Sequence, residues 1–160
     1  MRLELLNQYQ INEAVQSALN ELEFVYAYDE ENGAFHFVLP LEGPVSFLKV
    51  TIRTRETDFY VVSKLPLRGD ANDKWQIAEL VRLVAIINYG KVHGSFNIDV
   101  DDGELNFRTS CQTLGLNSLS TAAILYHLAL SSQMWKENVP LVIDVLFKKI
   151  SADEAVELNS

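Results

Sequence analysis

The sequence predicts an α+β fold in which a mostly antiparallel sheet of five to six strands is flanked by helices. Two observations carry this prediction. Strand-like segments follow one another with only short turns between them, and short connections favour antiparallel pairing. Helical periodicity occurs before, between and after those segments, in the order α–β–β–β–β–α–β–β–α–α. We therefore expect the helices to pack on one face of the sheet.

Length and composition indicate one globular domain that spans residues 1–160. The chain has 160 residues, of which 48% are hydrophobic and 22% charged, as is usual for a domain of ordinary size. Its net charge of −9 repels phosphate backbones and anionic membranes, so we expect no nucleic acid and no membrane as partners. Cys111 is the single cysteine, and the N-terminus has no apolar signal-peptide core. We therefore expect a cytoplasmic protein.

The first half of the chain reads as one helix followed by four strands. The helix is predicted over residues 8–22, and the strands over residues 24–28, 34–39, 45–55 and 58–65. The third strand alternates cleanly, with one apolar face (Leu48, Val50 and Ile52) and one polar face (Lys49, Thr51, Arg53 and Arg55). We expect its apolar face to point into the core.

Residues 70–90 form the strongest predicted helix. Asp70 and Asn72 are both candidates for its N-cap, and Gly90 is well placed to end it. Apolar side chains occupy two stripes of this helix: Trp75, Ala78, Val81 and Ala85 in one, and Ile77, Leu80, Val84 and Ile87 in the other. An apolar surface this wide predicts that the helix is mostly buried.

The acidic stretch at residues 94–110 is predicted to be a β-hairpin. With Asp102 and Gly103 as a two-residue turn, Val100 pairs with Leu105, and polar positions also face polar ones. A calcium loop would need acids at alternate positions before the glycine, and here Val100 interrupts that pattern. A looser cation site stays open as an alternative to a solvated hairpin tip. An exposed turn is also a poor place for a catalytic carboxylate pair, which needs burial to raise one pKa.

Two helices are predicted near the C-terminus. The first spans residues 117–135, and the second spans residues 141–150 after a break at Asn138 to Pro140. The polar tail at residues 151–160 is either partly helical or frayed.

Candidate catalytic and metal-binding residues are few. Cys111 could act as a nucleophile with His127 or His93 as its base, but no helix N-terminus or glycine-rich elbow follows it. Strand parity instead places Cys111 on the buried face, and His127 lies in an apolar helix, where a hydrogen-bonded interior histidine is usual. The three histidines show no metal spacing. The sequence therefore predicts no catalytic residues, no metal and no cofactor.

Basic charge is concentrated in the middle strands. Residues 45–68 carry five basic and two acidic side chains, whereas residues 1–35 carry one basic and seven acidic side chains. One interpretation is a basic sheet face that recruits an acidic partner, and the other is the ordinary polar face of a half-exposed sheet. The candidate binding residues on this face are Lys49, Arg53, Arg55, Asn97 and Arg108.

The central helix and the hairpin together resemble a known family. An asparagine near the helix end, a glycine, a D-x-x-D-G turn and an R-[TS] pair occur here as Asn88, Gly94, the turn at 99–103, and Arg108 with Thr109. This arrangement resembles the YbjN-domain family of bacterial proteins, described as sensory transduction regulators, over roughly residues 72–150. The resemblance implies a fold like that of type III secretion chaperones, which is often dimeric. It implies no catalytic site.

The sequence is compatible with three functions. The first is a non-enzymatic regulatory or chaperone-like protein-interaction module of unknown protein partner, with homodimerisation as a secondary prediction. The second is a small-molecule sensor with a pocket that uses Lys49, Arg53, Asn97 and Arg108. The third, an enzyme, would need a buried ionisable group with a shifted pKa inside a cleft.

Overall fold

A computed structural model describes residues 6–160, and its centre is one antiparallel sheet of six strands in the order β1-β2-β3-β4-β6-β5. The strands are β1 (Tyr26–Asp29), β2 (Ala34–Pro40), β3 (Phe47–Thr54), β4 (Asp58–Arg68), β5 (Ser95–Ile98) and β6 (Glu104–Gln112). Each neighbouring pair is antiparallel. The predicted fold class is therefore confirmed.

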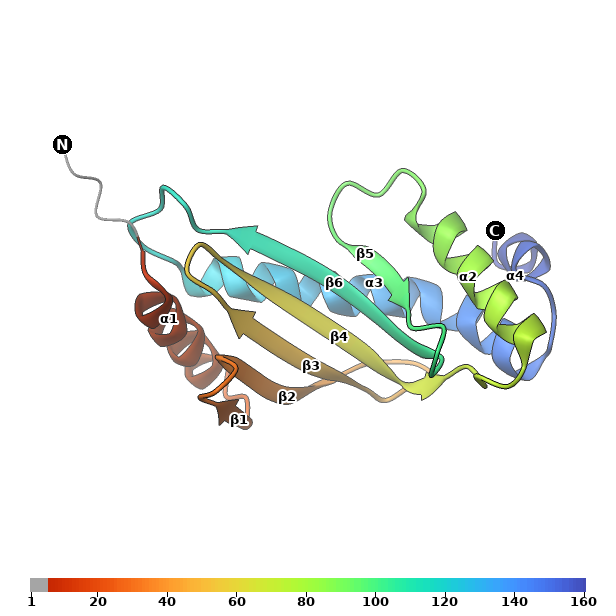
Figure 1. Cartoon of the computed structure of the whole chain (residues 1–160), viewed down its shortest axis with the longest axis horizontal. Helices are drawn as coiled ribbons and strands as arrows, with labels where there is room; N and C mark the ends of the chain where they lie inside the picture. The colour runs from red at the N-terminus through yellow and green to blue at the C-terminus, as the bar shows by residue number, and fades with distance from the viewer. Residues whose placement is uncertain (1–5) are drawn as a thin grey trace.

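Four helices accompany the sheet: α1 (Gln8–Glu21), α2 (Lys74–Asn88), α3 (Thr121–Phe147) and α4 (Ala152–Leu158). Figure 1 shows α3 running behind the sheet, while no helix crosses the front of β2, β3, β4 or β6. The helix α2 packs against β5, α3 and α4 at one end of the molecule. Among the described helices, none is both long enough and apolar enough to span a membrane.

The core lies between the back of the sheet and α3. The predicted alternation of β3 is confirmed, because Leu48, Val50 and Ile52 are buried there. Trp135 of α3 is also buried, and its indole Nε1 donates a hydrogen bond to Ser63 Oγ on β4 at 3.0 Å. This bond satisfies the polar end of a large buried side chain.

The helix α2 is less buried than its apolar sequence predicts. Its N-cap is Asp73, so the predicted caps at Asp70 and Asn72 are wrong. The stripe of Trp75, Ala78, Val81 and Ala85 is exposed. Neighbouring elements cover only one side of α2, because the helix lies at the end of the sheet rather than across its face.

The hairpin of β5 and β6 forms, but its turn differs from the prediction. Phe96 pairs with Phe107, and the backbone bond from Asp99 N to Glu104 O leaves a four-residue loop at 100–103. The predicted two-residue turn is therefore wrong. The pairing of the two strands is shifted by two residues from the predicted pairing. Each side chain therefore stays on the face of the sheet that was predicted for it. Gly69 N donates to Gly103 O at 2.9 Å, and this packing against the end of β4 favours the longer loop.

The predicted break at Pro140 is also wrong, because α3 continues through it from Thr121 to Phe147. A proline inside a helix costs about 3 kcal/mol. Buried side chains on both sides of Pro140, including Trp135, Val139 and Val142, offset that cost. The tail is helical rather than frayed, since α4 begins with a capping box of Ser151 and Glu154.

Candidate functional site

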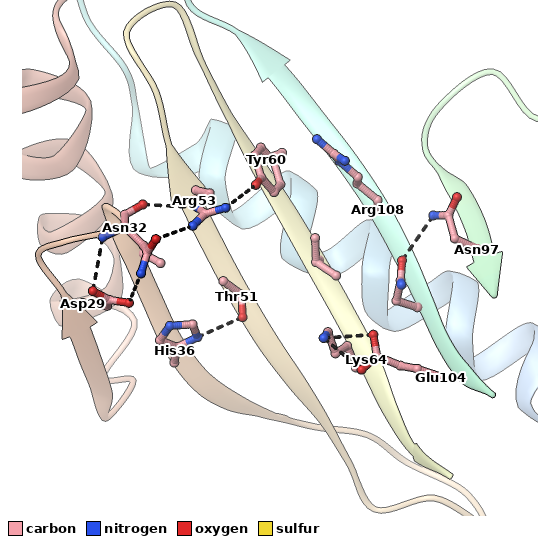
Figure 2. A pocket seen from close by; sticks show the side chains of 13 residues that line it. Asp29, Asn32, His36, Thr51, Arg53, Tyr60, Lys64, Asn97, Glu104 and Arg108 are labelled. Carbon is pink, nitrogen blue, oxygen red and sulfur yellow. Dashed lines mark hydrogen bonds and ion pairs between the residues drawn. The ribbon is translucent and has the colours of Figure 1, made fainter. Parts of the chain in front are cut away.

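The front of the sheet carries a polar hollow of about 510 Å³. Alternation along the strands places polar side chains of β3, β4 and β6 on this face, opposite the core. Figure 2 shows these side chains projecting from neighbouring strands, with residues of the β1–β2 turn at one edge. The lining comprises Asp29, Asn32, Ala34, His36, Thr51, Arg53, Tyr60, Val62, Lys64, Asn97, Glu104, Asn106 and Arg108.

Tyr60 lies at the centre of the hollow, between two arginines. Arg53 Nη1 donates to the Tyr60 hydroxyl at 3.4 Å, and the Arg108 guanidinium lies 4.1 Å from the centre of the Tyr60 ring. Figure 2 shows the two arginines on opposite sides of this ring. Guanidinium groups stack favourably on aromatic faces. The tyrosine thus contacts both arginines, and the Arg55 guanidinium also lies 5.4 Å from the centre of its ring.

Arg53 is positioned by the turn between β1 and β2. Its Nη2 donates to Asn32 Oδ1 at 2.9 Å, and its Nε donates to Asn32 O at 3.2 Å. Asn32 also donates to Asp29 at 2.7 Å. That hydrogen bond lowers the pKa of Asp29, so this carboxylate stays charged at the rim of the hollow.

The charges of the hollow are only partly compensated. Lys64 pairs with Glu104 at 2.9 Å. Within residues 6–160, neither Arg53 nor Arg108 forms an ion pair with a carboxylate. Two guanidinium groups with free donors therefore face solvent on the open face, and such groups bind carboxylates or phosphates in a bidentate manner.

The structure brings three of the five predicted site residues together, since Arg53, Asn97 and Arg108 all line the hollow. Lys49 lies on the same face, opposite Lys64 in the ladder, but outside the lining. Arg55 lies beyond the end of β3, where it forms a two-bond ion pair with Asp58.

Sequence reasoning missed the central residue of the hollow, Tyr60, and its supporting residue Asn32. The alternation of β4 could have placed Tyr60 on the polar face, because it sits opposite Arg53 in the β3–β4 ladder. No local signal connects Asn32 with Arg53, since 21 residues separate them.

Cys111 and His127, two of the other chemical candidates, are both at least partly buried. Burial raises the pKa of Cys111, which disfavours the thiolate that a nucleophile needs. His127 is a hydrogen-bonded interior histidine, as predicted: it is buried, and its Nδ1 lies 2.9 Å from Thr109 Oγ1. No group of three or more histidine, cysteine or acidic side chains among the described residues could hold a metal ion.

Comparison with known proteins gives structural matches only. No protein-family model matches the chain, and no curated protein sequence matches it. The crystal structure of YbjN from E. coli is similar at 12% identity, with a TM-score of 0.55, over 79% of this chain and 90% of that one. The structure of the HopA1–SchA chaperone–effector complex is similar at 13% identity, with a TM-score of 0.51, over 81% of this chain and 95% of that one.

A third match is the crystal structure of an uncharacterized protein from Methanothermobacter thermautotrophicus, at 12% identity and a TM-score of 0.49, over 84% of this chain and 98% of that one. Identities this low are informative about the fold alone. The first two matches agree with the resemblance of the central helix and hairpin to YbjN-domain proteins. The chain therefore has a YbjN-like fold.

Proposed function

We propose that the chain is a non-enzymatic protein-interaction module, one domain over residues 1–160, that works in the cytoplasm as a regulator or chaperone. In this proposal, the open face of the sheet docks an acidic segment of a partner protein. One observation carries it: the hollow holds Arg53 and Arg108 against Tyr60, with no carboxylate paired to either arginine among the described residues.

Charge distribution supports an acidic occupant. The chain as a whole is acidic, with a net charge of −9, so an acidic segment is repelled over most of the surface. The open face offers Arg53, Arg108 and Lys49 as local attraction. Complementary charge of this kind raises association rates and selects the docking position.

The shape of the face also supports a protein partner. The face of the sheet opposite α3, which no helix covers in Figure 1, presents a long surface on which an extended segment can lie. One structure with the same fold is that of a chaperone in complex with its effector. Homodimerisation remains part of this proposal, and light scattering that gives a monomer across micromolar concentrations would contradict it.

A small-molecule sensor is the second candidate, and the volume of the hollow favours it. A hollow of about 510 Å³ lies in the range of small-molecule sites, about 300–1,000 Å³. An anionic aromatic metabolite could place its ring near Tyr60 and its acid group between the two arginines. A thermal-shift screen of anionic metabolites tests this, and a flat response across the panel argues against it.

The main proposal is tested with variants that remove basic charge at two different places on the surface. The double variant Arg53→Gln/Arg108→Gln removes the two free charges of the hollow, while Arg82→Gln removes an exposed arginine on α2 that pairs with Asp153 instead. Quantitative affinity purification from extract, followed by fluorescence anisotropy with a labelled acidic peptide of the captured partner, compares the three proteins.

We expect the Arg82→Gln protein to retain the partner and the double variant to lose it, with peptide affinity falling as salt rises. A partner that binds all three proteins equally would refute the open face as its docking surface. No binding of any acidic peptide by the wild-type chain would refute the proposed occupant.

A further inference from the structure

A second polar hollow, of about 440 Å³, lies at the edge of the sheet where β6 extends beyond its short neighbour β5. Its walls are β6, the connection at residues 92–95 and the first turns of α3. The lining includes His93, Ser95, Arg108, Ser110, Tyr126 and His127. No carboxylate lines this hollow, although the chain has 22 acidic residues.

His127 presents a hydrogen-bond donor to this hollow. Its Nδ1 lies 2.9 Å from Thr109 Oγ1, so Nε2 is the ring nitrogen left for a ligand. Thr109 is buried, and the described residues offer its hydroxyl no other hydrogen-bond partner. A buried hydroxyl proton without an acceptor is costly, so the threonine donates to Nδ1. The neutral imidazole then carries its proton on Nε2.

Ser110 adds backbone groups at the same edge. The bond from Asp99 N to Glu104 O fixes the alternation of the β5–β6 ladder, and that alternation directs the N–H and C=O groups of Arg108 and Ser110 away from β4. Ser95 pairs with Arg108, but β5 begins there. The N–H and C=O of Ser110 are therefore left without a strand partner, beside the hollow.

His93 and His127 both line the second hollow. Burial lowers the pKa of His127, and the nearby His93 lowers it further. The other charged or titratable groups that line the hollow are Arg108 from β6 and Tyr126 from α3, the latter packed edge-on against His127 at 5.2 Å. An anion placed between these groups would accept hydrogen bonds from the imidazole N–H groups.

We propose that this second hollow is a binding site for a phosphate group, either as free inorganic phosphate or as a phosphate monoester. The Nε2–H of His127, the N–H of Ser110 and the side chain of His93 supply donors to its oxygens. A phosphate that keeps one proton can donate it to the Ser110 carbonyl. The site is separate from the open-face hollow except for Arg108, which lines both.

The test is an NMR titration of the imidazole resonances of the full chain. Inorganic phosphate and phosphoserine are the two probes, and sodium chloride at matched ionic strength is the reference. His36 lies on the open face, outside this hollow, and serves as an internal control. We expect phosphate or phosphoserine to shift the imidazole resonances of His93 and His127 and to leave those of His36 unchanged.

Two variants test whether phosphate binds in the second hollow. His93→Gln and Ser110→Pro should each weaken phosphate binding about tenfold, because each removes a donor to a charged ligand. Proline is tolerated where the lost N–H faces a sheet edge, and circular dichroism checks the fold of each variant. Arg82→Gln, on α2 and outside both hollows, should leave the response of His93 and His127 to phosphate unchanged. These two histidines lie outside the open-face hollow, so the readout is independent of the open-face proposal.

The two probes distinguish a site for free phosphate from a site for a phosphate monoester. A response to inorganic phosphate supports a site for the free ion, and a response to phosphoserine alone supports a site for a monoester. Unchanged imidazole resonances of His93 and His127 with both probes would overturn the proposal. An equal change at His36 would also overturn it, because phosphate would then show no preference for this hollow over the open face.

Discussion

Asn88 closes the outer edge of the sheet, and its replacement should measurably destabilise the protein. Its side chain acts as a strand neighbour for Phe96: Nδ2 donates to Phe96 O at 2.8 Å, and Phe96 N donates to Oδ1 at 2.8 Å. Asn88→Ala removes both bonds from an edge strand. Each such bond contributes about 0.5–1.5 kcal/mol, so we expect the free energy of unfolding to fall by about 2 kcal/mol.

Urea unfolding followed by circular dichroism measures this loss, and the melting temperature should fall by about 5 °C. Asn97→Ala is the matched control on β5, the strand that Asn88 contacts from α2, since Asn97 is exposed and its hydrogen bonds, at 3.2 Å, lie at the surface. We expect the control to change stability by less than about 0.5 kcal/mol. An Asn88→Ala protein as stable as the control would refute the role assigned to this edge contact.

Three further predictions concern other parts of the fold. Pro140→Ala should raise the free energy of unfolding by about 2 kcal/mol, since alanine is favoured over proline inside a helix; a loss of stability in urea would contradict this. Gly103→Ala should cost more than about 2 kcal/mol, because Gly103 has φ +75° and an added Cβ would overlap the backbone of Gly69. Gly115→Ala, at φ +86° with open space around it, should cost about 1 kcal/mol in the same assay, and equal costs would refute the contact. Burial lowers the pKa of His127 in the folded protein, so below the unfolded value of 6.5 the unfolded chain binds the proton more readily and stability falls as pH falls. Urea midpoints between pH about 8 and about 5 should therefore decrease less in His127→Gln than in the wild-type protein, and parallel decreases would contradict this.

Local sequence patterns predict the faces of the strands well, because the two-residue period of a strand is visible in the sequence itself. Leu48, Val50 and Ile52 could be assigned to the core on that basis. The same period cannot distinguish two registers that differ by two residues. The loop at 100–103 depends on the contact between Gly69 and Gly103, which lie far apart in the sequence.

Tertiary packing also overrides local rules in the helices. Pro140 signals a break, but burial on both sides of it keeps α3 continuous. The apolar stripe that begins at Trp75 signals burial, but no other described element covers it.

The residues of the candidate site could likewise be predicted from the sequence only where a local pattern identifies them. Arg53 and Arg108 could be chosen from strand parity, because both fall on polar faces. The inclusion of Asn32 and the exclusion of Arg55 depend on the β1–β2 turn and on the end of β3. Which residues belong to the hollow therefore depends on contacts between segments that are distant in the sequence. A local sequence pattern does not show such contacts.

The strand order has a consequence for how the chain folds. The strands β1 to β4 pair in chain order, but β6 joins β4 across the whole of α2 and β5. Ser63 and Phe107, which pair at this junction, are 44 residues apart. Loop closure of that length is entropically unfavourable before the core forms. We therefore expect the junction between β4 and β6 to form late and to limit the folding rate, so that the first four strands gather before the rest of the sheet closes onto them.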